Sequence, residues 1–256
     1  MKIIYCGYGR AGLECFYQII NTLNIKFNDI VVFTHNTKDN QDFISHLKNN
    51  KIKFFFENIN KKYRSLIKFN GNLLISSYYR FIINPKILKL VNYRAMNLHP
   101  SLLPAYRGTK SSVWALINHE KITGITFHYI NEKIDEGKII LQKKIEILES
   151  DTAYSLYHKL ISLFVKNFTE ALTRLIKNYK GKKQRGKASH YKRRLPFDGV
   201  RNFNEITYDE GKQFVKAMYF PGYKSAFFKK YKKLKKIEIR EIEELQKFKN
   251  LFKRKK

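Results

Sequence analysis

Residues 2–12 read KIIYCGYGRAG, in which a short apolar run is followed at once by three closely spaced glycines. The run Lys2–Cys6 predicts a buried strand, and the glycines predict a tight turn that leads into a helix over Leu13–Leu23. Further apolar runs that predict strands are Ile30–Phe33, Ile52–Phe56 and Leu73–Ser76. Their alternation with helical patterns predicts the α/β class, with a Rossmann-like, mostly parallel sheet flanked by helices.

The three glycines fit the pattern Gly7-x-Gly9-x-x-Gly12, which is found where a dinucleotide binds at the start of a helix. A dinucleotide site also uses an acidic residue after the second strand to bind the ribose. The residues there are 34–37, and they include no Asp or Glu. We therefore expect this turn to face a phosphate or another anion rather than NAD.

The composition is that of a folded, basic protein. Of the 256 residues, 43% are hydrophobic, which excludes wholesale disorder and predicts one large domain, with or without a small appendage. Lys and Arg number 51 against 21 Asp and Glu, so the formal net charge is +30. The two cysteines, Cys6 and Cys15, exclude a disulfide framework and a cysteine-based zinc site, and they favour a cytoplasmic location.

Much of the positive charge lies late in the chain. Residues 177–194 hold nine basic and no acidic residues, and residues 224–256 hold fourteen basic and four acidic ones. Such segments attract nucleic acid, acidic membranes or phosphorylated substrates, but a lysine-rich composition that fills the surface produces them too. Charge alone therefore names no partner. The sequence has no run of about 18 apolar residues, so we expect no membrane span.

The most informative stretch is residues 95–143, AMNLHPSLLPAYRGTKSSVWALINHEKITGITFHYINEKIDEGKIILQK. On an extended backbone, Asn97 and His99 point to the same face. They place an amide donor beside a group that titrates near neutral pH, which suits acyl transfer. Asp135, in the turn before Gly137, can orient the histidine or accept a proton through water. Taken singly, each of these residues can equally well be part of a turn or a loop.

Several motifs in this stretch occur together in one enzyme family. They are Asn97-x-His99-Pro-Ser-Leu-Leu-Pro104, Tyr106-Arg107-Gly108, Gly124-x-Thr126-x-His128 and Asp135-x-Gly137. In this order they closely resemble the formyltransferases that use 10-formyltetrahydrofolate, over roughly residues 1–180. The resemblance implies that Asn97, His99 and Asp135 are catalytic, that 10-formyltetrahydrofolate is the formyl donor, and that no metal takes part.

The same resemblance assigns a role to each catalytic residue. Asn97 would donate a hydrogen bond to the developing oxyanion, and His99 would transfer a proton and donate to the same oxygen. Asp135 would set the protonation state and position of the histidine. How proton transfer is divided between His99, Asp135 and water is left open by the sequence.

The resemblance further implies a folate pocket lined by one loop before the Asn97 strand and by another before Asp135. Tyr79, Phe81 and Ile82 would form apolar walls. Arg80 would pair with the glutamyl carboxylate of the folate or remain a solvated surface residue. The residues expected in this pocket are Ser77, Tyr78, Tyr79, Arg80, Phe81, Ile82, His128 and Ile130.

Three acceptor amines occur in this family: methionyl-tRNA, glycinamide ribonucleotide and nucleotide-linked amino sugars. Residues 191–199 and 214–226 resemble the region after the catalytic domain in the nucleotide-sugar N-formyltransferases. We therefore expect an amino-deoxy sugar carried on dTDP, with UDP as the other choice, for surface polysaccharide such as O-antigen, and no nucleic-acid partner. The alternatives are a methionyl-tRNA formyltransferase with a shortened C-terminal unit and a non-catalytic RNA-binding protein on the same scaffold.

Acceptor binding calls for basic side chains that neutralise a diphosphate and aromatic ones that stack on a base. We expect a catalytic domain over 1–188, a small acceptor-binding or oligomerisation unit over 189–228 and a basic helix or tail over 229–256. The resemblance also implies a homodimer. The expected acceptor-binding residues are Gly9, Arg10, Tyr106, Arg107, Lys192, Arg193 and Tyr223.

Overall fold

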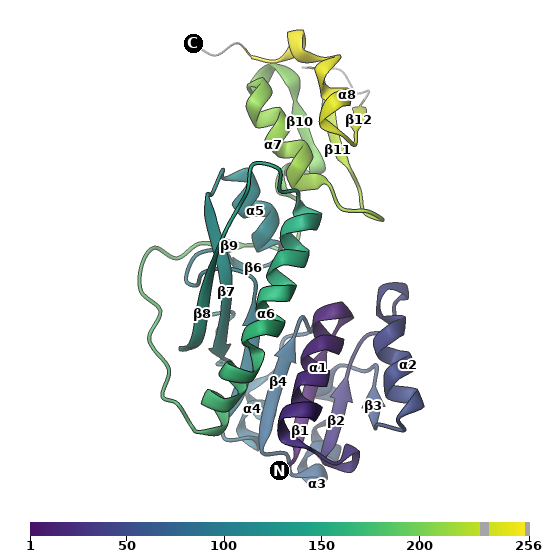
Figure 1. The fold of residues 1–256 in the computed structure, drawn as a ribbon, viewed down its shortest axis with the longest axis vertical. Helices are drawn as coiled ribbons and strands as arrows, with labels where there is room; N and C mark the ends of the chain where they lie inside the picture. Colours follow the sequence, from purple (N-terminus) through teal and green to yellow (C-terminus); the bar gives the residue numbers. More distant parts are fainter. Residues whose placement is uncertain (231–235, 254–256) are drawn as a thin grey trace.

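The computed structural model describes residues 1–230 and 236–253 of the chain. Figure 1 shows an α/β body, a smaller C-terminal unit at one end of it, and a long helix, α6, that crosses the body. The body contains β1 (Ile3–Gly7), α1 (Gly9–Leu23), β2 (Ile30–Phe33), α2 (Gln41–Asn49), β3 (Phe54–Phe55), α3 (Tyr63–Phe69), β4 (Leu73–Ser77), α4 (Pro85–Leu90), β5 (Ala95–His99), β6 (Arg107–Gly108), α5 (Ser111–Ile117), β7 (Ile122–Tyr129), β8 (Ile139–Glu146), α6 (Ala153–Ile176) and β9 (His190–Tyr191). The C-terminal unit contains β10 (Val200–Asn202), α7 (Tyr208–Met218), β11 (Ala226–Lys229), β12 (Lys236–Ile239) and α8 (Ile242–Gln246).

A seven-stranded sheet forms the centre of the body, in the order β3-β2-β1-β4-β5-β7-β8. The first five strands in this order run parallel, whereas β7 and β8 pair antiparallel. The mostly parallel α/β sheet predicted from the sequence is therefore confirmed. Because β1, β4 and β5 are parallel and in register, their carboxyl ends meet at one edge, where Gly7, Ser77 and His99 lie.

Helix α6 packs against one face of this sheet. It begins at a capping box between Thr152 and Ser155, which satisfies backbone N–H groups of its first turn. Its buried stripe, which includes Leu160, Phe164 and Phe168, joins side chains of α1 and the sheet in one core, and a second core lies on the α3 and α4 side. The sheet, with the edge that carries Gly7, Ser77 and His99, is thus supported by packing on both faces.

Helix α1 begins earlier than the sequence predicts, at Gly9 rather than Leu13. The Gly12 N–H already donates to the Tyr8 carbonyl at 3.0 Å, so Gly9 and Gly12 belong to the first helical turn. The Gly9 N–H donates to Asn40 Oδ1 at 2.8 Å. The side chain of Asn40 therefore occupies one of the donors that an anion would otherwise use.

The C-terminal unit has its own small sheet and its own core. Strands β10, β11 and β12 pair in that order, and the core beneath them includes Phe214, Phe228, Leu245 and Phe252. The predicted helix or tail over 229–256 is wrong for the described part of that range, because β12 pairs antiparallel with β11 and α8 follows. The predicted boundary after residue 228 falls inside β11. Part of that call, residues 231–235 and 254–256, lies outside the described residues.

Candidate active site

Asn97 lies on β5 between β4 and β7, where its register partners are Ser76 and His128. The Ser76 hydroxyl donates to Asn97 Oδ1 at 2.8 Å, which fixes the end of the amide that carries hydrogens. Asn97 Nδ2 then donates one hydrogen to His128 Nε2 at 3.2 Å. Its second N–H has no partner within residues 1–230 and 236–253, and it can donate to a substrate oxygen.

Asp135 lies in the loop between β7 and β8, in the left-handed region at φ +55°. The Gly108 N–H donates to Asp135 Oδ2 at 2.8 Å, and Gln184 Nε2 donates to the carbonyls of Asp135 and Gly137 at 2.8 and 2.9 Å. A β-carbon at position 137 would lie 1.7 Å from the Tyr129 carbonyl oxygen, so the loop can fold back only with glycine there. The carboxylate is therefore held on several sides.

His99 ends β5 and is only 3% exposed. Its Nδ1 lies 3.4 Å from Asp135 Oδ2, and its Nε2 lies 2.8 Å from the Tyr106 carbonyl oxygen. Both partners are acceptors, so only the doubly protonated ring satisfies the two contacts at once. Burial nevertheless lowers the pKa of His99, and the charge of Asp135 offsets this only in part. The ring is thus placed to hold a proton only while negative charge is near.

The pKa of Asp135 is set by its neighbours rather than by burial. Burial by itself raises the pKa of this carboxyl, but the charge of His99, the hydrogen bond and charge of His128 and the Gly108 N–H together bring the pKa below its ordinary value. Asp135 is therefore a carboxylate at neutral pH. It can accept a proton late in a reaction, once its surroundings have become more negative.

His128, on β7, connects two of the predicted catalytic residues. Its Nδ1 lies 2.8 Å from the Tyr129 carbonyl oxygen and donates to it, so Nε2 accepts from Asn97 in the neutral ring and carries a hydrogen towards Asp135 only in the protonated ring. The same Nε2 lies 3.5 Å from Asp135 Oδ1. The sequence places His128 in the folate pocket, whereas the structure places it between Asn97 and Asp135.

An amide donor, a buried imidazole and a carboxylate thus form one cluster, as the sequence predicts for Asn97, His99 and Asp135. Such a cluster can donate to an oxyanion and move a proton from an attacking amine, which are the needs of acyl transfer. No group of three or more His, Cys, Asp or Glu side chains within the described residues is arranged to hold a metal ion.

The residues predicted to line a folate pocket occupy several environments. Ser77 is fully buried at the end of β4, and the Tyr78 ring packs against Tyr157 and Phe164 of α6, in the core. The N–H of Ile130 donates to the Ala95 carbonyl at 2.9 Å, so Ile130 extends the edge of the sheet beside β5. Ser77 and Tyr78 therefore belong to the packed interior beneath the site.

The second half of the same loop faces outward. The rings of Tyr79 and Phe81 each lie 5.0 Å from the ring of His35, measured between centroids. Phe81 and Ile82 are 40% and 66% exposed, which is unusual for apolar side chains so close to buried polar residues. These two side chains are available to an apolar ligand, and so is Ile134, the residue before Asp135, at 53% exposure.

Arg80 already has partners in the N-terminal part of the body. Its guanidinium lies 3.9 Å from the centre of the Tyr8 ring, donates to the Tyr8 hydroxyl and lies 3.8 Å from Asp39 Oδ2. The predicted contact with a folate carboxylate would have to compete with Asp39.

Two of the predicted acceptor residues instead contact His99 and the loop that carries Asp135. Arg107 pairs with Glu136 at 2.9 Å and donates to Gln184 Oε1 at 2.7 Å, next to Asp135. Tyr106 uses its carbonyl to bind His99, and its hydroxyl donates to Glu120 at 2.6 Å. Both residues therefore hold the site together.

The remaining predicted acceptor residues divide between two places. Lys192 and Arg193 lie next to the catalytic loop, because the Thr109 hydroxyl donates to the Lys192 carbonyl at 3.1 Å. Arg10 contacts the His158 ring at 3.3 Å and Glu14 at 3.6 Å, on the side of α1 that faces α6. Tyr223 is 61% exposed and packs edge-on against Phe220.

Comparisons with known proteins agree with this geometry. The formyl transferase family model matches residues 28–172. GDP-perosamine N-formyltransferase of Brucella melitensis is 36% identical over 234 residues, which are 89% of this chain and 88% of that one. This chain belongs to the formyl transferase family.

Two further relatives show how far the likeness extends. The N-formyltransferase of Helicobacter canadensis, solved with folinic acid and dTDP-3-aminofucose, superposes with a TM-score of 0.76 and 23% identity over 88% of this chain and 83% of that one. The methionyl-tRNA formyltransferase of Thermodesulfovibrio yellowstonii is 38% identical, but over 58% of this chain and 47% of that one. The likeness to the tRNA enzyme is therefore the shorter of the two.

Three residues of this formyltransferase that the sequence did not single out lie in or beside the site: Lys110, Tyr157 and Gln184. Gln184 lies in the basic segment after α6, and it is recognisable only from its contacts with the Asp135 loop. The ring of Tyr157 lies 5.8 Å from that of Tyr78, one of the predicted binding residues, and burial raises the pKa of Tyr157 to about 12. No motif of the sequence includes it.

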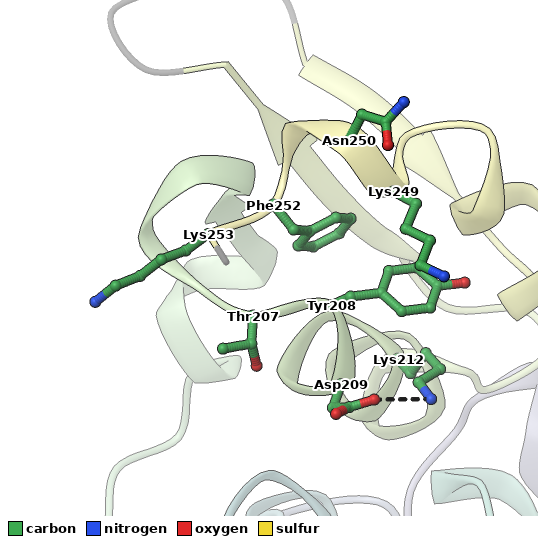
Figure 2. A pocket seen from close by; sticks show the side chains of 8 residues that line it. All are labelled: Thr207, Tyr208, Asp209, Lys212, Lys249, Asn250, Phe252 and Lys253. Carbon is green, nitrogen blue, oxygen red and sulfur yellow. Dashed lines mark ion pairs between the residues drawn. The ribbon is translucent and has the colours of Figure 1, made fainter. Parts of the chain in front are cut away.

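A cavity of about 530 Å³ lies elsewhere, in the C-terminal unit of this formyltransferase. Figure 2 shows it between the start of α7 and the chain end, with Tyr208, Lys249 and the Asp209–Lys212 ion pair at its wall. None of the predicted site residues lines it. No helix of residues 1–230 and 236–253 is long and apolar enough to cross a membrane.

Proposed function

We propose that this formyltransferase is a sugar N-formyltransferase that moves the formyl group of 10-formyltetrahydrofolate to the amino group of a nucleotide-linked amino-deoxy sugar. The observation that carries the proposal is the extent of the likeness. The match to GDP-perosamine N-formyltransferase covers 89% of the chain, whereas the match to methionyl-tRNA formyltransferase covers 58%. A tRNA enzyme and a non-catalytic RNA-binding protein are therefore the weaker readings.

The donor is supported by exposed apolar side chains on the two loops that are predicted to line the folate pocket. Phe81, Ile82 and Ile134 expose apolar side chains there, and a flat aromatic ring system would cover them. The neighbour from Helicobacter canadensis was solved with folinic acid, a formylated folate. We propose that 10-formyltetrahydrofolate binds across these residues, supplies the formyl group, and that no metal takes part.

In the proposed reaction, the acceptor nitrogen attacks the formyl carbon and forms a new C–N bond, while the bond from that carbon to the folate nitrogen breaks. The formyl oxygen gains negative charge during the attack. The free Asn97 N–H can donate to it, and His99, whose two ring nitrogens face Asp135 and the Tyr106 carbonyl, can add positive charge beside it once its ring is protonated. Asp135 stabilises that charged ring at 3.4 Å.

The attacking amine must lose a proton, and the leaving folate nitrogen must gain one. Asp135 is the carboxylate within reach of His99, so a proton can pass from the amine to this pair, directly or through water, and from the pair to the leaving folate nitrogen. The Gly108 N–H holds the carboxylate in place while its charge changes. The site therefore supplies both stabilisation of the oxyanion and a group that accepts and returns the proton.

Two nucleotides compete as the carrier of the sugar. The sequence resemblance favours dTDP, which is also the nucleotide in the Helicobacter canadensis complex, and the relative from Brucella melitensis acts on a GDP-linked sugar. We retain dTDP as the proposal and GDP as the alternative to test. A cytoplasmic location, a homodimer and a role in surface polysaccharide such as O-antigen belong to the same proposal.

The test compares acceptors with one donor. Purified protein is incubated with 10-formyltetrahydrofolate and, separately, dTDP-4-amino-4,6-dideoxyglucose, GDP-perosamine or charged initiator tRNA, and tetrahydrofolate release is followed. We expect turnover with at least one nucleotide sugar and none with tRNA. Turnover with tRNA alone would contradict the proposal.

A further inference from the structure

Lys110 lies in a short segment that is bonded to the catalytic cluster at both ends. Two residues before it, the Gly108 N–H donates to Asp135 Oδ2 at 2.8 Å. One residue after it, the Ser111 hydroxyl donates at 2.9 Å to the carbonyl of Pro100, which follows His99. The backbone of Lys110 is therefore fixed beside the reacting groups.

The segment also holds the basic linker that follows α6. Figure 1 shows this linker running back past the edge strand β8 before it reaches β9. There, β9 pairs in parallel with β6, and the N–H and hydroxyl of Thr109 donate to the carbonyls of Tyr191 and Lys192, both at 3.1 Å. Arg193 follows directly, so two basic residues from distant parts of the chain lie close together.

The two side chains lack counter-charges. Within residues 1–230 and 236–253, neither Lys110 nor Arg193 forms an ion pair or a side-chain hydrogen bond, whereas Arg107 in the same loop is neutralised by Glu136. Lys110 is half-buried, and burial followed by the charge of Arg193 lowers its pKa. Like charges held together without an acidic partner repel each other, and an anion between them removes that repulsion.

The backbone at Lys110 is also unusual. Its φ of +58° lies in the left-handed region, which a residue with a β-carbon rarely adopts. Such a conformation persists where the surroundings enforce it, and it recurs at binding sites. Here the bonds at Gly108 and Ser111 enforce it, and it fixes the direction in which the lysine leaves the loop.

We propose that Lys110 and Arg193 together bind the diphosphate of the acceptor and so position the sugar amine at Asn97 and His99. This inference rests on the proposed function. A diphosphate carries its charges on one compact group, so it can neutralise two adjacent cations at once. The two carboxylates of a folate glutamate are farther apart and fit an adjacent pair of cations less well.

The test removes the positive charge of Lys110 and compares this variant with one that keeps the charge. Lys110→Met and Lys110→Arg are compared with Lys166→Met, which removes a lysine from the exposed face of α6. For each protein, kcat and the KM values for donor and nucleotide sugar are measured, and GDP, dTDP and pyrophosphate are titrated separately by calorimetry. Circular dichroism and thermal melting show whether each variant is folded.

We expect Lys110→Met to raise the KM for the nucleotide sugar by roughly 10- to 100-fold, with a smaller change in kcat and no change in the KM for the donor. The affinity for a nucleoside diphosphate should fall by a similar factor, and Lys110→Arg should recover most of it. Lys166→Met should behave as the wild-type protein. The KM for the sugar should also rise less steeply with salt in Lys110→Met.

Several results would overturn the inference. An unchanged KM for the sugar in folded Lys110→Met would refute it while the proposed function stands, and a rise confined to the KM for the donor would assign the cations to the folate carboxylates. If no nucleotide sugar is formylated, the proposed function fails and the calorimetric titrations alone test the anion site. Binding of a nucleoside diphosphate or pyrophosphate to the wild-type protein that is lost in Lys110→Met supports the site. Absence of binding to the wild-type protein refutes it.

Discussion

The predicted catalytic cluster (Asn97, His99 and Asp135) and the proposed acceptor side (Lys110 and Arg193) are linked through Gly108, whose N–H donates to Asp135, but the two regions use their polar groups differently. Around Asn97, His99 and Asp135, nearly every donor and acceptor has a protein partner. Around Lys110 and Arg193, positive charges stand without partners among the described residues. Groups that perform chemistry are pre-organised by the protein, whereas groups that bind a charged substrate leave their strongest interaction to that substrate.

The largest expected effect comes from the catalytic side. Asp135→Asn keeps the shape of the side chain but removes the charge that stabilises a protonated His99, and His99→Ala removes the ring. Each variant should reduce kcat by about 100-fold or more, measured by tetrahydrofolate release. Activity close to the wild-type level in both folded variants would show that the cluster is not the reacting centre.

A smaller effect is expected from the support of Asn97. Ser76→Ala removes the hydroxyl that fixes the Asn97 amide, so kcat should fall by about 10-fold with little change in either KM. Ser162→Ala, on the exposed side of α6, is the matched control. If Ser76→Ala raised a KM and left kcat intact, the amide would serve binding instead.

The stability of the protein should depend on pH through His35. Burial, followed by the charges of Arg80 and Arg193, lowers the pKa of His35 from 6.5 to about 4. The unfolded chain therefore takes up a proton on this residue before the folded protein does, and the free energy of unfolding should decline as the pH falls from 6.5 towards 4. His35→Gln should remove part of this decline, on the order of 1 kcal/mol after solvent screening, in urea titrations at several pH values. An identical decline in the variant would contradict this assignment.

The smallest effect is expected at the edge of the acceptor side. Tyr223→Ala removes an exposed ring that can stack on a base, so the KM for the nucleotide sugar should rise by about threefold. Tyr63→Ala, at 37% exposure on α3, should leave it unchanged. Equal effects of the two substitutions would argue against a base at Tyr223.

The fold and the cluster of Asn97, His99 and Asp135 could be predicted from sequence patterns, for physical reasons. The apolar run Leu73–Ser76 predicts a buried strand, and it lies in β4, which is buried along its whole length. Asn97 and His99 share one strand, so their proximity is local. Asp135 comes from another loop, and its place in the cluster was predictable from motif order alone.

The rest depends on contacts that no local pattern records. The sequence offers Arg80 as free, but Asp39 reaches it through the fold. The charged residues Lys236, Glu238 and Arg240 flank Ile237 and Ile239 of β12, which is why this segment resembles a charged tail. Lys110 belongs to no motif. Its closeness to the segment that carries Arg193 follows only from the hydrogen bonds of Thr109 to the carbonyls of Tyr191 and Lys192.

The most direct test of the whole account is the identity of the product. The protein is incubated with 10-formyltetrahydrofolate and dTDP-4-amino-4,6-dideoxyglucose or GDP-perosamine, and the nucleotide sugars are analysed by mass spectrometry and NMR. We predict that one of them gains a single formyl group on its amino nitrogen with the wild-type protein and not with Asp135→Asn. Recovery of both sugars unmodified, under conditions in which the same protein formylates another amine, would contradict it.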